Sequence, residues 1–367
     1  MRALAAVVAA ATLSGCAVVS ALGSLASGPS AEMSDGMRIA ERYRVSAISD
    51  RRFNHADYWR ALAPSFRSER LRVADVGHSM QGRELRTITF GTGPVTVLLW
   101  SQMHGDESTA SMALADIFAW LAASGSDDLR DRLGERLTVT FLPMLNPDGA
   151  ERFQRENAAG IDINRDARRL ATPEGQTLKM LQERLRPQFG FNLHDQNART
   201  RVGRDGRQAG IALLAPAADA ERTWGPVRSR ARLVAAGVAA NLESAIGGRV
   251  AKYDDAFNPR AFGDLMQTWG TSTVLIESGA LPDDPQKQEL RKLNVAAIIG
   301  ALNAIATEEY TKADPDDYER LPFNTGGAYD LLVRGADLVV PGAPPLRADV
   351  AINYDDPVAR EGGRVRE

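Results

Sequence analysis

Histidine and glutamate side chains at three places in the chain could together bind a metal ion. His104 and Glu107 lie three residues apart in the segment SQMHGDESTA, directly after the apolar run PVTVLLW. This spacing lets both side chains point into one concavity. A catalytic zinc site needs three protein ligands and an open position for water. His194, which follows the segment FGFNL, is the natural third ligand among four histidines. The alternative is two polar residues on an ordinary turn, because an H-x-x-E pair also occurs by chance.

Two further polar residues follow apolar segments in the same manner. Asn146 follows VTFLPML, and Glu277 ends the apolar run TVLI. In α/β sheets, ligands collect at the carboxyl ends of the strands, so these residues and the three possible metal ligands could converge on one edge. A buried glutamate at the end of an apolar strand needs a function or a partner. Glu277 is therefore a candidate functional residue, and a salt-bridged carboxylate is the alternative.

Alternating strands and helices must position these side chains. We expect strands at 83–91, 94–102, 136–146, 189–195, 210–216 and 271–279, and helices at 108–124, 173–186, 221–246 (with an interruption near Gly225) and 285–309. This order favours an α/β sandwich with a largely buried sheet. From about Tyr310, alternating apolar positions and Gly/Pro turns predict a small β-rich appendage, 310–367, packed on the main body.

The N-terminus has the layout of an export signal. MRALAAVVAAATLSGC combines one arginine, an apolar run too short to span a membrane, and small residues. LSGC resembles the bacterial lipobox, in which the cysteine is lipid-modified, and Cys16 is the only cysteine in the chain. We expect a signal peptide at 1–16 and a flexible tether at 17–35. The alternative is a plain secretory signal with an incidental cysteine. Acyl chains on Cys16 would anchor the protein without spanning the membrane.

Composition limits the remaining possibilities. The 367 residues can form a large core, and a hydrophobic fraction of 44% is typical of globular proteins. The net charge of -3 gives no electrostatic case for nucleic-acid binding. The body of the chain contains no apolar run of membrane-spanning length.

Several motifs in this order resemble a known family. NPDG at 146–149, an arginine in RENAAG and DINR at 162–165 are similar to the M14 zinc carboxypeptidases, the carboxypeptidase A group. HGDE at 104–107, FNLHD at 191–195, LIESG at 275–279 and the upstream segment VGHSMQGRELRTITFG complete the pattern. The resemblance covers roughly residues 35–305. It implies a catalytic domain at 36–309 with a three-layer α/β/α sandwich and a mixed, mostly parallel sheet.

The resemblance also implies roles for the metal-site residues. His104, Glu107 and His194 would bind one Zn²⁺ per chain, in the His₂Glu set of carboxypeptidase A. Glu277 would be the general base that accepts a proton from water and returns it to the leaving amine. Arg155 would stabilise the developing oxyanion, with Arg152 as the competing candidate.

Other matches concern the substrate and the orientation of the ligands. Asn164 and Arg165 match the pair that binds the terminal carboxylate, for which a guanidinium fork is well shaped. Asp162 matches the acid that orients the first zinc histidine by accepting its other N–H. The tyrosine that closes over substrate has no secure match; Tyr253 is the candidate, and Arg260 is an alternative contact.

The chain departs from the digestive members of the family. Asp106 stands where they carry an arginine, which puts their substrate subsite in doubt, and the span from NPDG to DINR is shorter. The expected function is a zinc metallocarboxypeptidase that removes C-terminal residues, each with a free carboxylate, from exported or cell-wall peptides. A zinc amidohydrolase of the aspartoacylase or succinylglutamate desuccinylase type and an inactive binding lipoprotein are the alternatives. We expect a lipid anchor on the periplasmic face, with Ala17 favouring the outer membrane, and no nucleic-acid partner.

Overall fold

A computed structural model describes residues 31–204, 206–339, 341–353, 359–361 and 364–366. The predicted signal peptide, Cys16 and most of the predicted tether lie outside these residues. Helix α1 (Ala31–Arg42) begins inside the segment 17–35 that we predicted as a tether, so the last five residues of that segment are helical.

An eight-stranded mixed sheet forms the centre of the molecule, with the strand order β1-β2-β4-β3-β5-β9-β7-β8. The four central strands β4, β3, β5 and β9 are parallel, whereas β2 pairs antiparallel with β1 and β4, and β7 pairs antiparallel with β9. The strands are β1 (Leu71–His78), β2 (Glu84–Phe90), β3 (Val95–Ser101), β4 (Leu137–Leu142), β5 (Phe189–Asp195), β7 (Ile211–Leu214), β8 (Val250–Lys252) and β9 (Ser272–Ser278). The prediction of a mixed sheet is confirmed.

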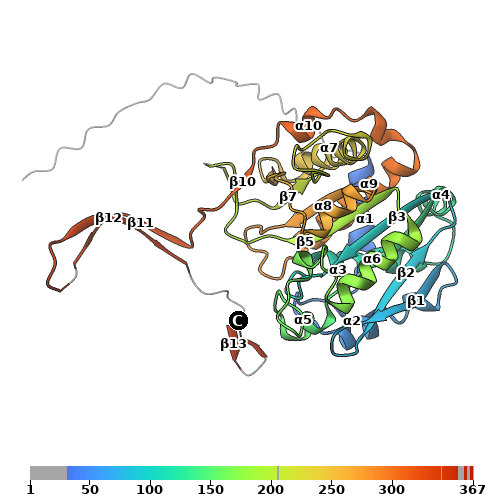
Figure 1. The fold of residues 1–367 in the computed structure, drawn as a ribbon, viewed down its shortest axis with the longest axis horizontal. Coiled ribbons are helices and arrows are strands. Elements are labelled where there is room, and N and C mark those ends of the chain that lie inside the picture. Colours follow the sequence, from blue (N-terminus) through green and yellow to red (C-terminus); the bar gives the residue numbers. More distant parts are fainter. Residues whose placement is uncertain (1–30, 205, 340, 354–358, 362–363, 367) are drawn as a thin grey trace, which may run out of the picture.

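Helices cover both faces of the sheet, which makes the predicted three layers (Figure 1). The larger buried cluster packs α3 (Thr109–Ala122), α7 (Pro226–Ile246) and α9 (Gln288–Ala306) on one face. The smaller cluster, on the other face, packs α6 (Pro173–Leu185) and α8 (Phe262–Thr268) against Leu98, Trp100 and Leu142. Burial on both faces explains why the central strands are nearly continuous apolar runs.

The pattern supplied neither the order of the strands nor the two edge strands β1 and β8, for which we predicted no strand. β2 and β3 follow each other in the chain, yet β4 lies between them. In the pairing of β5 with β9, His194 is the register partner of Glu277. This register brings two residues that are distant in the chain to one end of the sheet.

Some elements were not predicted. Helix α4 (Asp128–Arg136) has the sequence DLRDRLGER and buries only Arg130 and Leu133, so it has no long apolar stripe. The helices α2 (His55–Leu62) and α5 (Pro147–Arg152) are short. Helix α7 begins at Pro226, directly after Gly225, so the segment 221–224 lies outside the helix that we expected.

The C-terminal region differs from the prediction in how it packs. It contains the short helix α10 (Asp316–Glu319), β10 (Asn324–Thr325), a hairpin of β11 (Leu331–Leu338) and β12 (Leu346–Ile352), and the small pair β13 (Ala359–Glu361) and β14 (Arg364–Arg366). The side chains of β11 and β12 are nearly all exposed, and the hairpin projects from the body (Figure 1). The prediction that this whole region packs on the main body is therefore wrong for the hairpin, because its apolar positions face no partner layer.

Among the helices of the described ranges, none combines the length and the apolar character that crossing a membrane requires.

Candidate active site

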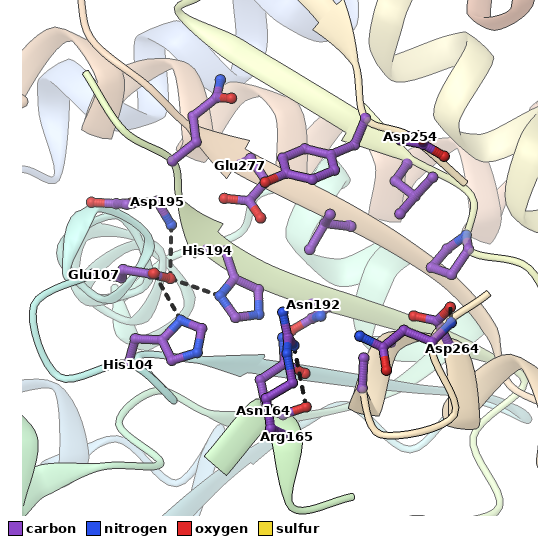
Figure 2. A pocket seen from close by; sticks show the side chains of 18 of the residues that line it. His104, Glu107, Asn164, Arg165, Asn192, His194, Asp195, Asp254, Asp264 and Glu277 are labelled. Atoms are coloured by element: carbon purple, nitrogen blue, oxygen red, sulfur yellow. Dashed lines mark hydrogen bonds and ion pairs between the residues drawn. The ribbon is translucent and has the colours of Figure 1, made fainter. Parts of the chain in front are cut away.

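Three side chains that we predicted as metal ligands lie together at the carboxyl ends of the central strands. In His104, Glu107 and His194, one ligand atom from each lies within 4.8 Å of the others, and all three residues are buried. The two carboxylate oxygens of Glu107 each lie 2.7 Å from a ring nitrogen: Oε1 from His104 Nδ1, and Oε2 from His194 Nδ1. Figure 2 shows both imidazole rings turned toward this carboxylate.

The backbone around the ligands holds Glu107 in place. The Glu107 N–H donates to the His104 carbonyl at 3.1 Å, and the Asp195 N–H donates to Glu107 Oε2 at 3.1 Å. Gly105 packs so closely on the start of α5 that a Cβ would lie 2.0 Å from the Gly149 carbonyl carbon. A larger residue at 105 would therefore displace the loop that carries two ligands.

Asp162 and Arg155 complete the surroundings of the ligands. Asp162 Oδ1 lies 3.1 Å from His104 Nε2, and the Arg155 guanidinium contacts Asp162 Oδ2 at 3.0 Å and Glu107 Oε1 at 3.2 Å. Burial lowers the pKa of His104, but the carboxylates of Glu107 and Asp162 outweigh it and raise the pKa to about 9. Burial raises the pKa of Glu107, but the two histidines outweigh that effect and lower it strongly.

The donor set fits one zinc ion. An acceptor at His104 Nε2 keeps the ring proton there and leaves the Nδ1 lone pair facing the cluster. The other imidazole, His194, has a pKa lowered by burial, so it is neutral as a metal ligand must be. On His104, zinc would take the place of the second ring proton that the carboxylates of Glu107 and Asp162 favour. One carboxylate and two imidazoles are then the ligand set of a catalytic zinc site that keeps a position open for water. The predicted His–Glu–His triad for one Zn²⁺ is thus confirmed.

Glu277 is presented to the same cluster from the adjacent strand β9. Its carboxyl group faces the hollow bordered by the three ligands (Figure 2). Desolvation and the charge of Glu107 raise the pKa of Glu277 to about 8. Its surroundings therefore favour proton uptake, which a general base requires. No ion pair to Glu277 occurs among the described residues, which disfavours the alternative of a salt-bridged strand end.

The hollow beside the ligands has a volume of about 280 Å³ and brings together most of the residues predicted to contact substrate. Asn164 and Arg165, on the 3-10 turn Ile163–Arg165, line it, and Tyr253 lines it while remaining 36% exposed. The Phe262 N–H donates to Asn164 Oδ1 at 3.0 Å, which orients this amide. Arg155 also borders the hollow, together with the zinc ligands.

Arg260 lies outside this hollow. It lines an adjoining depression with Arg165, Arg168 and Arg169, and its Nε donates to the Arg165 carbonyl at 3.4 Å. Arg152, the competing candidate for Arg155, ends helix α5 and is likewise absent from the lining. Neither arginine therefore lines the hollow beside the ligands.

Several residues at the site were not singled out from the sequence. Asn192 and Asp264 line the hollow, and the side-chain oxygen of Asn192 is buried without a hydrogen-bond partner in the described structure. Burial raises the pKa of Asp264 to about 6. Asn192 could have been found as an amide inside an apolar strand. Asp264 could not, because its helix reaches the hollow only through the tertiary fold.

Asn146 has a positional role at the site. Its side chain caps helix α5 by accepting from the Gly149 N–H at 2.9 Å, and its amide nitrogen donates to the carbonyls of Met103 and Arg155, each at 3.2 Å. It thus ties the ligand loop to the segment that carries Arg155. The other two histidines lie away from the ligands: His78 is exposed, whereas His55 is buried with its Nε2 lying 3.0 Å from the Glu84 carbonyl oxygen.

Comparisons with known proteins agree with this geometry. Residues 56–200 match the family model of the zinc carboxypeptidases, Peptidase_M14. The chain is 32% identical over 123 residues to the "Probable carboxypeptidase 2" of Trichophyton verrucosum, a match that covers 32% of this chain and 23% of that protein. It is 28% identical over 102 residues to carboxypeptidase SOL1 of Arabidopsis thaliana, covering 26% of this chain and 21% of the relative. The matches thus span less than a quarter of these relatives.

Solved structures share the fold at low sequence identity. A metallo-carboxypeptidase from Burkholderia cenocepacia superimposes with a TM-score of 0.55 at 18% identity, covering 70% of each chain. Bovine thrombin-activatable fibrinolysis inhibitor superimposes with a TM-score of 0.56 at 12% identity, covering 71% of this chain and 97% of the other.

Proposed function

We propose that the chain is a zinc-dependent metallocarboxypeptidase of the M14 family, whose family model matches residues 56–200. The observation that carries the proposal is the meeting of the His104–Glu107–His194 cluster with the Glu277 carboxyl group in one hollow. The proposed substrates are exported or cell-wall peptides with a free C-terminal carboxylate.

Glu277 performs the proton transfers in this proposal. When bound, Zn²⁺ polarises the scissile carbonyl and lowers the pKa of a water molecule. Glu277 accepts a proton from that water as the oxygen attacks the carbonyl carbon. It then returns the proton to the amine as the carbon–nitrogen bond breaks. The raised pKa of Glu277 supports this role, because a carboxyl group with a pKa near the operating pH can both accept and release a proton.

Arg155 stabilises the carbonyl oxygen as it gains negative charge. Support comes from its guanidinium, which borders both the ligand cluster and the hollow. Burial lowers the pKa of Arg155, but its neighbours Asp162 and Glu107 outweigh burial and raise the pKa, so the group stays cationic. A fixed cation beside the developing charge stabilises the transition state more than the ground state.

Asn164 and Arg165 bind the terminal carboxylate of the substrate, which restricts cleavage to chain ends. Support comes from their place in the hollow across from Glu277. Charge-assisted hydrogen bonds from a guanidinium fork hold a carboxylate in one orientation. A peptide amide in place of the carboxylate would lose this grip. Tyr253 remains the candidate for closing over the substrate, supported by its partial exposure at the rim.

The experiment is a digestion of a peptide library, including cell-wall fragments, read by mass spectrometry. We expect loss of single C-terminal residues that stops with a chelator and returns with zinc. Each free-acid peptide is paired with its C-terminal amide, and the Arg165→Ala variant is compared on both. We expect this variant to lose activity on the free acids and to differ little from the wild type on the amides. Cleavage of N-acyl amino acids with none of peptides would instead favour an amidohydrolase.

We also propose that the chain is exported and lipid-anchored through Cys16 on the periplasmic face, at the outer membrane. The support is the lipobox-like LSGC and the following Ala17. The test is detergent-phase partitioning of the expressed protein beside Cys16→Ser. Equal partitioning of the two proteins into the aqueous phase would contradict the anchor.

A further inference from the structure

A second hollow adjoins the candidate active site on the side away from Arg165. It has a volume of about 640 Å³ and shares Glu107, Arg155, Asp195, Gln196 and Asn197 with the first hollow. Asn164 and Arg165 line the first hollow and not the second. Of the three metal ligands only Glu107 lines both spaces, so they meet beside Glu107, and the proposed carboxylate-binding residues border the first hollow alone.

The wall of the second hollow includes a residue from the C-terminal region. Asp330 lines it, although this residue is 53 positions beyond Glu277 in the chain. We call the segment 322–330, which leads to Asp330, the strap. Its strand β10 pairs antiparallel with β6 (Arg201–Val202), which belongs to the loop that follows His194. The two-stranded sheet of β10 and β6 thus joins the strap to the loop that follows His194.

Side-chain and backbone contacts hold the strap against that loop. The Asn324 amide donates to Gln196 Oε1 at 2.9 Å, and the Ala328 N–H donates to the Arg199 carbonyl at 3.2 Å. The Arg199 guanidinium donates twice to Asp330 Oδ2, from Nη2 at 2.7 Å and from Nε at 3.2 Å. Gln196 and Arg199 line the second hollow themselves. These contacts hold the strap in place, so that Asp330 forms part of the wall of the second hollow.

The Arg199–Asp330 pair is partly open to water, with side-chain exposures of 29% and 34%. A surface ion pair adds little to the stability of a fold, because water screens it and the two side chains lose freedom. A pair on the wall of a cavity can instead exchange partners with a polar ligand. Because both side chains line the hollow and remain partly exposed, each can contact a polar ligand there.

A carboxypeptidase substrate has one residue beyond the scissile bond, and its terminal carboxylate is held by Arg165 in the proposed function. The remainder of the peptide must leave the ligands on the other side. We propose that the second hollow binds the residues before the scissile bond and that the strap, through Asp330 and Arg199, contacts them. This inference rests on the proposed function and adds a preference for long peptides with polar residues to it.

The test compares two substrates that share their last two residues, a blocked dipeptide and a blocked hexapeptide. We expect Asp330→Ala to lower kcat/KM for the hexapeptide about three- to tenfold, chiefly by raising KM, because the net contribution of one hydrogen bond corresponds to about that factor. The dipeptide, which does not reach the strap, should change by less than about twofold. Arg199→Ala should have the same selective effect, and the double variant should lose less than the product of the two.

Asp337→Ala is the matched control, since this exposed aspartate lies on β11 of the same C-terminal region and outside the lining. It should leave both substrates unchanged. An equal loss on both substrates, or no loss on either, with Asp330→Ala would overturn the proposal. Binding of both peptides to the Glu277→Gln variant, measured by calorimetry, decides the inference separately from turnover. A hexapeptide that binds no tighter than the dipeptide contradicts the strap, whereas normal selective binding without hydrolysis in the wild type contradicts only the proposed activity.

Discussion

At the scale of single residues, the site depends on one carboxylate placed between two imidazoles. Glu107 contacts both His104 and His194. The two histidines lower the pKa of Glu107, and Glu107 acts to raise the pKa of each histidine, so the three groups interact strongly. Arg155 and Asp162 add a second layer of opposite charges. Removing one of these groups leaves a buried charge without its partner, which costs more than the pair itself contributes.

Glu277 can be tested without disturbing that cluster. The Glu277→Gln variant should bind zinc at the wild-type ratio yet lose turnover by about 10²- to 10⁴-fold, because a general base commonly contributes that much. Metal content and kcat/KM on one free-acid peptide are the measurements. His194→Ala serves as the contrast and should lose both zinc and turnover. Wild-type turnover in the Gln variant would assign the base to another residue.

The pH dependence of kcat/KM follows from the same carboxyl group. Only the ionised form accepts a proton, so activity should fall as the pH is lowered through the pKa of Glu277. Desolvation and Glu107 raise that pKa from the ordinary 4.5 to about 8, and the charge of bound zinc acts in the opposite direction. The acidic limb should therefore lie between these two values. A limb at or below 4.5 would show that Glu277 is not the group that titrates.

At the scale of elements, the register of two strands and the capping of one helix position the site. The pairing of β5 with β9 sets His194 beside Glu277, and a slip of one residue would turn either side chain to the opposite face. Asn146 links the ligand loop, helix α5 and the Arg155 segment through three hydrogen bonds. The residue that caps helix α5 thus also helps to position Arg155 at the site.

A buried ion pair joins the elements behind the site. The Arg291 guanidinium on α9 bonds Asp116 on α3 at 2.7 Å and also donates to the Val45 carbonyl, and both charged side chains are 1% exposed. Arg291→Ala should lower the free energy of unfolding by about 3–5 kcal/mol, because it leaves the buried Asp116 carboxylate without its cationic partner. Urea unfolding measures this. Arg132→Ala is the control, because Arg132 on α4 makes only a partly exposed hydrogen bond to Asn303 on α9. This substitution should lower the free energy of unfolding clearly less.

At the scale of the whole molecule, the site joins parts of the chain that are far apart in sequence. Two adjoining hollows are bordered by several segments: the loop after β3, the turn at Ile163–Arg165, the ends of β5 and β9, and the strap. None of these segments makes a site alone. The stability of the fold and the integrity of the site are therefore linked.

Removal of the metal should reveal that link. A ligand that binds only the folded state stabilises it by about 2.7 kcal/mol at 100 times its dissociation constant. We expect a chelator to lower Tm by several degrees, and added zinc to restore it. Calorimetry of the wild type beside His104→Ala makes the comparison, and the variant should not respond to zinc. An identical response in both proteins would place the stabilising ion elsewhere.

The sequence alone determined the central strands, the long helices and the main residues that can do chemistry. Apolar runs with Gly and Pro boundaries identified the central strands, and the residues at their ends included all three metal ligands and Glu277. These features are local, because strand propensity and the alternation of strands and helices depend on neighbouring residues.

Only the tertiary structure decided which of these residues meet. Contacts between distant segments place β4 between β2 and β3. Such contacts also bring Asp264 into the first hollow, leave Arg260 outside it and place Asp330 in the wall of the second hollow. Such contacts are set by how whole faces pack and by which hydrogen bonds a long loop finds, and no window of neighbouring residues contains that information.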